Sequence, residues 1–186
     1  MFKRAFLALS LLLWSLVACA ALSTSQLAVL KAAILADPVL AAETPDSDGA
    51  QRIADAMNAL AAPAFYVWRT NVSREEIYNS TSAEATTWNW TTYKNQGATE
   101  QNAWTQMFMG DRANFAQANL RAGVAAIFTG SGPANAQRDH ILAVAKRPAT
   151  RGEKLFAVGT GTLLAPATMA FEGVITYQDV QNARSL

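Results

Sequence analysis

The stretch RANFAQANLRAGVAAIF, residues 112–128, carries the strongest helical pattern in the chain. Its large apolar side chains recur at the spacing of one helical face: Phe115, Leu120, Val124, Ile127 and Phe128. Gly130 and Gly132 end the pattern, and Pro133 can open a further helix that continues towards Pro148. The sequence therefore predicts two consecutive helices in this part of the chain.

Helix start signals recur elsewhere along the chain. Ser73 and Glu76 have the spacing of a capping box, in which each side chain bonds the backbone N–H of the other residue. The same chemistry predicts helices after Ser23, after Asp48 and after Thr176, the last with Asp179 three residues on. A paired-carboxylate catalytic role for Glu75 and Glu76 is disfavoured, since neighbours in a first helical turn point in different directions.

These signals predict an all-α fold of about six or seven short helices in one domain, residues 22–186. The run Phe65–Trp68 fits either a short buried strand or the lead into a helix. Phe171–Ile175 fits a short extended segment. Gly159 and Gly161 predict a flexible C-terminal part from about residue 158.

Composition favours a surface that is partly covered. Charged residues make up 16% of the chain, below the usual quarter or so, while 51% are hydrophobic and many of those are alanine. Aromatic residues, at 9%, are too frequent for a disordered chain. We therefore expect contacts with a partner or with further copies of the chain.

Residues 1–21 resemble a secretory signal. Lys3 and Arg4 precede the apolar run 5–17, which is short for a bilayer span. Leu16–Cys19 has the form of a bacterial lipobox, so Cys19 is a candidate for lipid attachment. The competing interpretation is an over-extended start, with the natural protein beginning near Leu22, and the sequence leaves both open.

Catalytic and metal chemistry finds little support in the sequence. One cysteine allows no internal disulfide and no thiolate metal cage, and His140 is the single histidine. Gly159-Thr160-Gly161 lacks the third glycine of a dinucleotide loop and the lysine of a phosphate loop. We expect no enzymatic activity, no catalytic residues, no cofactor and no metal.

Two groups of residues are candidates for an interface. Trp88, Trp90 and Trp104 are typical of a core or a subunit contact. The basic residues Arg147, Arg151 and Lys154 could contact phosphates, but no aromatic residue is interleaved with them, so we disfavour nucleic-acid binding.

Charge is distributed unevenly along the chain. Residues 37–84 hold eight acids and three bases, whereas residues 112–154 hold seven bases and two acids. Opposite charges on two surfaces would suit a head-to-tail contact between copies, which can close into a ring. The alternative is two unrelated solvated faces.

Several short stretches together resemble a family of small, mostly uncharacterised proteins encoded by tailed bacteriophages and prophages. They are LSTSQL (22–27), DP (37–38), DSDGA (46–50), FYVWRT (65–70), EIY (76–78), TTWNW (86–90), EQNAW (100–104), RAG (121–123), EKLFA (153–157) and FEG (171–173). The resemblance covers residues 22–186 and excludes 1–21. Pro148 and Gly152 interrupt a stretch in which the family implies continuous helix.

The resemblance implies a virion structural or assembly protein and places no catalytic residues. Within that class we expect a head-to-tail neck adaptor that forms a ring, binds portal or tail components and is assembled in the host cytoplasm. An alternative is a prophage lipoprotein held at the bacterial membrane through Cys19. A further alternative is a nucleic-acid-binding module that uses the basic run 146–154.

Overall fold

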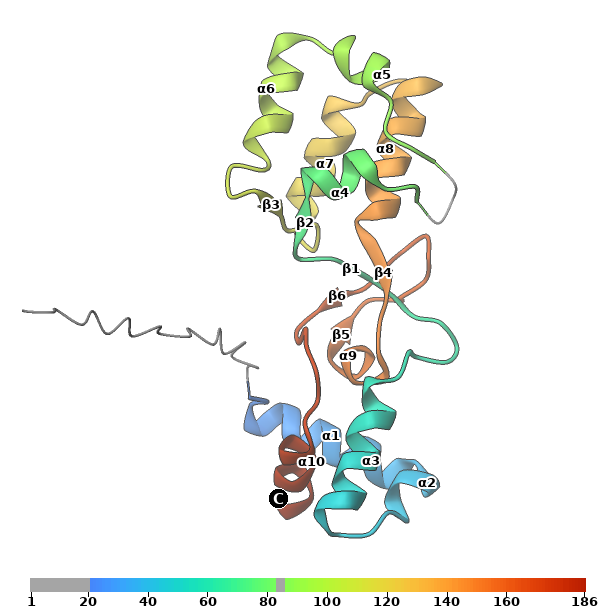
Figure 1. The fold of residues 1–186 in the computed structure, drawn as a ribbon, viewed down its shortest axis with the longest axis vertical. Helices are drawn as coiled ribbons and strands as arrows, with labels where there is room; N and C mark the ends of the chain where they lie inside the picture. The colour runs from blue at the N-terminus through green and yellow to red at the C-terminus, as the bar shows by residue number, and fades with distance from the viewer. Residues whose placement is uncertain (1–20, 83–85) are drawn as a thin grey trace, which may run out of the picture.

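The structure is a computed structural model that describes residues 21–82 and 86–186 (Figure 1). Its helices are α1 (Thr24–Ala36), α2 (Pro38–Ala41), α3 (Ser47–Asn58), α4 (Arg74–Asn79), α5 (Trp90–Lys94), α6 (Ala98–Gln106), α7 (Ala118–Ile127), α8 (Pro133–Val144), α9 (Arg151–Phe156) and α10 (Tyr177–Ser185). Its strands are β1 (Tyr66–Trp68), β2 (Val72–Ser73), β3 (Arg112–Ala113), β4 (Lys146–Pro148), β5 (Ala157–Val158) and β6 (Thr168–Met169).

The expectation of an all-α fold with six or seven helices is wrong. The described residues form ten helices and three small antiparallel sheets, β1–β4, β2–β3 and β5–β6, so the fold is mixed α/β. Each strand has two or three residues, too few to show an alternating apolar pattern. Strand β1 pairs with β4 some 80 residues later, with Val67 opposite Arg147. No local sequence pattern predicts a pairing partner at that distance.

The chain builds two helical lobes on either side of a middle segment (Figure 1). Helices α1, α2, α3 and α10 form the terminal lobe, and residues 72–82 and 86–144, with α4 to α8, form the inserted lobe. The middle segment contains β1, β4, α9, β5 and β6. Strand β1 leads the chain into the inserted lobe and β4 leads it out, so one antiparallel pair carries both connections.

Each lobe has its own apolar core. The core of the terminal lobe extends into the middle segment and consists of Leu22, Leu30, Ile34, Leu40, Ala50, Ile53, Ala54, Met57, Phe156, Phe171, Ile175, Val180 and Ala183. That of the inserted lobe consists of Val72, Ile77, Trp88, Trp104, Phe108, Ala113, Phe115, Val124, Ile127, Phe128, Ile141, Val144 and Ala145. A small cluster of Val67, Ala149 and Ala167 lies between them at the β1–β4 pair.

Local capping chemistry sets many helix starts. The capping boxes predicted at Ser73 and Thr176 are confirmed, since Ser73 Oγ accepts from the N–H of Glu76 and Thr176 Oγ1 from that of Asp179. The cap predicted at Asp48 is wrong by two residues, because Asp46 accepts the N–H of Gly49 and α3 begins at Ser47.

The helix predicted over 112–128 is shorter than its pattern. Arg112 and Ala113 pair with β2, and the Asn114 side chain accepts the N–H of Ala116 in a turn, so α7 begins only at Ala118. Phe115 is nevertheless buried, which explains why it matched the apolar pattern. Phe171–Ile175 contains no strand, and the extended pairing lies earlier, at Thr168–Met169.

Candidate functional site

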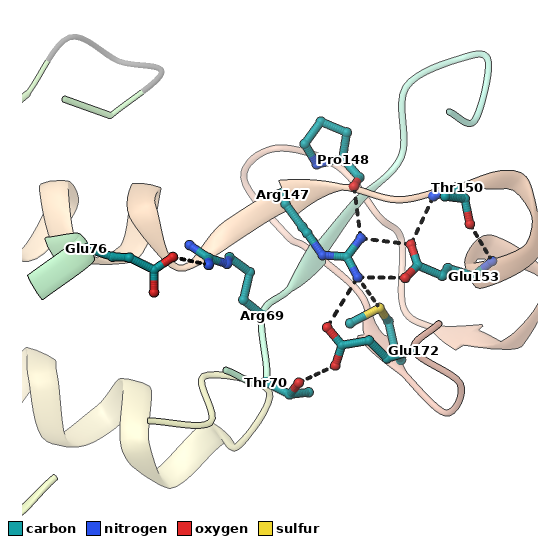
Figure 2. Close-up of polar contacts among 9 residues, drawn as sticks. Arg69, Thr70, Glu76, Arg147, Pro148, Thr150, Glu153 and Glu172 are labelled. Carbon is teal, nitrogen blue, oxygen red and sulfur yellow. Dashed lines mark hydrogen bonds and ion pairs between the residues drawn. The ribbon is translucent and has the colours of Figure 1, made fainter. Parts of the chain in front are cut away.

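A charged network lies in the middle segment and centres on Arg147 of β4. Its guanidinium forms two hydrogen bonds to the carboxylate of Glu153, 2.8 Å from Nη1 to Oε2 and 2.6 Å from Nη2 to Oε1. Glu172 approaches the same Nη2 at 3.3 Å. Figure 2 shows the guanidinium held between the two carboxylates. This parallel geometry is the strong, orientation-specific form of an arginine–carboxylate pair.

The sequence places Glu153 for this role through another capping box. Thr150 caps α9, the Thr150 N–H donates to Glu153 Oε2 at 3.0 Å, and Thr150 Oγ1 accepts the N–H of Glu153 at 3.1 Å. The Glu153 side chain is only 4% exposed. Burial alone would raise the pKa of Glu153, but the hydrogen bonds from Arg147 and Thr150 outweigh it, and the pKa is lowered.

The network continues into the inserted lobe. Thr70 Oγ1 donates to Glu172, and Arg69 pairs with Glu76, which caps the start of α4 (Figure 2). Arg69 Nη1 also donates to the carbonyl of Val144 at 3.2 Å, at the end of α8. These contacts fasten the inserted lobe to the strands that carry it, which is a structural role.

The other basic candidates are also engaged within the chain. Arg151 pairs with Asp37 at 2.8 Å, and the Lys154 ammonium lies 5.5 Å from the centre of the Phe65 ring. Arg112 lies 4.0 Å from Glu76. Some acids of the segment 37–84 are therefore paired with bases of the segment 112–154 inside one molecule.

The three candidate tryptophans separate into two environments. Trp88 and Trp104 are buried in the core of the inserted lobe, and Trp104 Nε1 donates to the Tyr78 hydroxyl at 3.0 Å. Trp90 is 56% exposed and lies over Tyr78, with 4.8 Å between ring centres. Of these three, Trp90 is the side chain that a partner can reach.

His140 lies inside the inserted lobe and is fully buried. Its Nε2 is 2.8 Å from the carbonyl of Ile77, and its Nδ1 is 3.2 Å from Thr86 Oγ1. Both ring nitrogens are thereby engaged, so His140 ties α8 to α4 and to the segment before Trp88.

Exposed apolar residues on α1 form a surface that the sequence analysis missed. We call the exposed residues Ala28, Val29, Ala32, Leu35 and Ala36 the α1 outer face. The opposite side of the helix buries Leu30 and Ile34 in the core. The sequence of α1, TSQLAVLKAAILA, has one charged residue in thirteen. A helix that is apolar on all sides is typically buried on all sides, so this composition could have predicted the α1 outer face.

A second exposed apolar feature is the loop between β5 and β6. Leu164 there is 96% exposed, and Leu163 beside it is also exposed. Contiguous apolar exposure on a folded chain is typical of a protein contact. The α1 outer face and the Leu164 loop are therefore the candidate functional surfaces.

Within residues 21–82 and 86–186 no three His, Cys, Asp or Glu side chains cluster as a metal site. No helix in this part of the chain has the length and apolarity needed to cross a membrane. Cys19 lies outside the described residues. Comparisons of the chain with protein-family models, curated proteins and solved structures find no match.

Proposed function

We propose that this chain is a non-enzymatic structural or assembly protein of a tailed-bacteriophage particle, and within that class a head-to-tail neck adaptor. In this proposal copies associate with one another into a ring and bind portal or tail components. The family resemblance of residues 22–186 supports the phage setting, and the exposed apolar surfaces support the assembly role.

The α1 outer face is the observation that carries the assembly role. Leu35, at 65% exposure, and its apolar neighbours lie on the face that points away from the core of the terminal lobe. Leaving such a face in water forfeits the gain from burying apolar area, roughly 25 cal/mol per Å². A partner that covers the α1 outer face recovers this gain.

The engaged basic residues make nucleic-acid binding a weaker candidate. Arg147 and Arg151 have carboxylate partners inside the chain, so each must exchange an existing ion pair for any phosphate contact. Because of these ion pairs, charge reversal at the two arginines would measure the stability of the fold. A test of ring formation therefore requires a substitution at an exposed apolar position.

The solution mass measured by light scattering tests the assembly proposal. It is measured on the full chain and on a chain that begins at Ala21, because both cores are built from residues after position 21. A discrete multimer that Leu35→Asp dissociates, with unchanged circular dichroism, supports self-assembly through the α1 outer face. A monomer at every concentration, alone and mixed with portal or tail proteins, contradicts it.

A prophage lipoprotein is the second candidate, and one local feature favours it. Cys19 stands in a lipobox pattern, and Leu22 is already buried in the terminal lobe. A lipid on Cys19 would therefore hold α1 close to the membrane surface. Cys19→Ser tests this, since it should release the full chain from the membrane fraction. An unchanged membrane fraction contradicts the lipoprotein.

A further inference from the structure

Trp90 presents an aromatic ring to solvent, and other rings hold it in position. The centre of its ring lies 4.8 Å from that of Tyr78, 5.6 Å from that of the buried Trp88 and 6.0 Å from that of Tyr93. Trp90 is also the first residue of α5, whose start is capped by the Asn89 side chain. The indole, 56% exposed, is therefore a fixed aromatic platform, which lowers the entropy cost of binding.

A polar depression adjoins the Trp90 platform. Its volume is about 530 Å³, within the range of ligand sites, roughly 300–1,000 Å³. It is lined by Ser73, Arg74, Glu75, Tyr78 and Asp111. Tyr78 belongs to both features, since its ring packs against Trp90 and the same residue lines the depression. The Tyr78 hydroxyl accepts from Trp104 Nε1, so core packing fixes the residue that joins them. We call platform and depression together the Trp90 site.

The charged side chains of the Trp90 site are not used by the fold. Within residues 21–82 and 86–186, the side chains of Arg74, Glu75 and Asp111 have no hydrogen-bond or ion-pair partner. The neighbouring Glu76, by contrast, is paired with Arg69. Arg74 and Glu75 belong to α4, and Asp111 to the turn between α6 and β3. Tertiary structure thus brings together one guanidinium and two carboxylates that are available to a ligand.

Asp111 has an unusual backbone conformation. Its φ is +63°, in the left-handed region, and no other non-glycine residue in the described parts of the chain has a positive φ. Such a conformation costs free energy in a residue with a side chain, and residues of this kind cluster at ligand sites. The conformation of Asp111 therefore adds support to a binding role.

We propose that the Trp90 site binds a neutral saccharide. The C–H face of a sugar ring packs on the face of an indole, and the hydroxyl groups at its edge both donate and accept hydrogen bonds. Arg74 supplies donors for them, and Glu75 and Asp111 supply acceptors. The inference goes beyond the proposed assembly role and does not depend on it, because the Trp90 site lies in the inserted lobe and the α1 outer face in the terminal lobe (Figure 1).

The mixed charges of the depression favour an uncharged ligand. The carboxylates of Glu75 and Asp111 repel a phosphate, so a nucleotide stacked on Trp90 is disfavoured. An organic cation is attracted by the carboxylates and by an aromatic face, but the guanidinium of Arg74 opposes it. A neutral ligand with several hydroxyl groups bonds all three charged groups without a repulsive contact.

Binding of the full chain to an array of neutral and acidic glycans tests the site. We expect binding to a subset of the neutral glycans, and Trp90→Ala should weaken it by roughly tenfold or more, the effect of removing a central aromatic contact. Trp90→Phe keeps an aromatic ring and should retain more affinity. Tyr177→Ala is the matched control, because Tyr177 is 45% exposed and lies in the terminal lobe. No glycan binding, or equal weakening by Trp90→Ala and Tyr177→Ala, overturns the saccharide site.

Substitutions at Asp111 test the hydrogen-bonding edge. Asp111→Asn keeps an acceptor oxygen and a residue that tolerates left-handed backbone, whereas Asp111→Ala removes both. Asp111→Ala should weaken glycan binding by roughly tenfold, and Asp111→Asn by less. Titration with tetramethylammonium chloride distinguishes a cation site. Binding of this cation that both variants lose would assign the site to a cation and overturn the saccharide.

The remaining competitor is a subunit contact through Trp90, and light scattering tests it. Trp90→Ala should leave the solution mass of the protein unchanged. A lower mass in this variant would make Trp90 a subunit contact, which overturns the saccharide site while self-assembly stands. A monomer that binds neutral glycans supports the saccharide site and contradicts only the proposed self-assembly.

Discussion

The Nη2 atom of Arg151, in the first turn of α9, lies 2.8 Å from Oδ2 of Asp37, where α1 ends and α2 begins. Asp37 also accepts the N–H of Val39 through Oδ1 at 3.0 Å. The hydrogen bond from Arg151, followed by that from Val39, lowers the pKa of Asp37. One carboxylate thus caps a helix and joins the terminal lobe to the middle segment.

Asp37→Ala should destabilise the protein more than Arg151→Met. The arginine change removes an ion pair whose side chains are both partly exposed, a contact of small value, whereas the aspartate change also removes the cap of α2. Urea unfolding midpoints of the two variants check the order. Equal losses would mean that the cap contributes nothing.

Arg147→Met should cost about 3 kcal/mol of unfolding free energy. It leaves the carboxylate of Glu153 buried without its bidentate partner, and the partial exposure of Arg147 keeps the cost at the low end of the range for buried pairs. Lys154→Met is the control, since Lys154 is exposed and should change stability by less than about 0.5 kcal/mol. A similar loss in both variants would contradict the structural role of the network.

Acid should destabilise the protein as the pH falls below about 5. The pKa values of Glu153 and Glu76 are lowered in the fold, because hydrogen bonds to their partners outweigh the effect of burial. At a pH between the folded and the unfolded pKa values of these carboxyls, the unfolded chain binds more protons than the folded chain. Their contribution to stability is therefore fully present above the unfolded pKa and is lost as the pH falls through the folded pKa.

Glu153→Gln isolates the contribution of one carboxyl. It should lower stability at pH 7 and flatten the loss of stability below about pH 5, measured by urea unfolding at each pH. Glu75→Gln serves as a control because Glu75 is an exposed neighbour of Glu76. An unchanged slope in the Glu153 variant would place the acid sensitivity elsewhere.

Trp104→Ala should cost roughly 3–5 kcal/mol, because a fully buried indole leaves a large cavity and the Tyr78 hydroxyl loses its donor. Trp90→Ala should cost far less, since more than half of that side chain is in water. Chemical denaturation of the two variants side by side measures the difference. Equal costs would contradict the division of the tryptophans into buried and exposed sites.

Capping residues were the most predictable part of the fold. Ser73 with Glu76 and Thr176 with Asp179 act within four residues, so the sequence contains the whole interaction. The charged network could not be predicted in the same way. Arg147 and Glu153 are close in sequence. Thr70 reaches the network through the pairing of β1 with β4, and Glu172 through the placement of β6 beside β5 and β1.

The candidate surfaces were predictable only in part. The α1 outer face follows from the composition of one helix, whereas the exposure of Leu164 depends on the contact of its loop with β1 and Phe65. Trp88, Trp90 and Trp104 look equivalent in the sequence, and only tertiary packing separates them. The helix pattern of 112–128 likewise gave way to the pairing of β3 with β2.

The insertion of residues 72–144 between β1 and β4 has a consequence for the order of folding on the ribosome. All helices of the inserted lobe have been synthesised once Val144 has emerged, so this lobe can close while translation continues. The terminal lobe needs Val180 and Ala183 of α10 against α1 and α3 to complete its core. Its first three helices therefore wait through the synthesis of more than a hundred residues, and the apolar side of α1 is open to chaperones during that time.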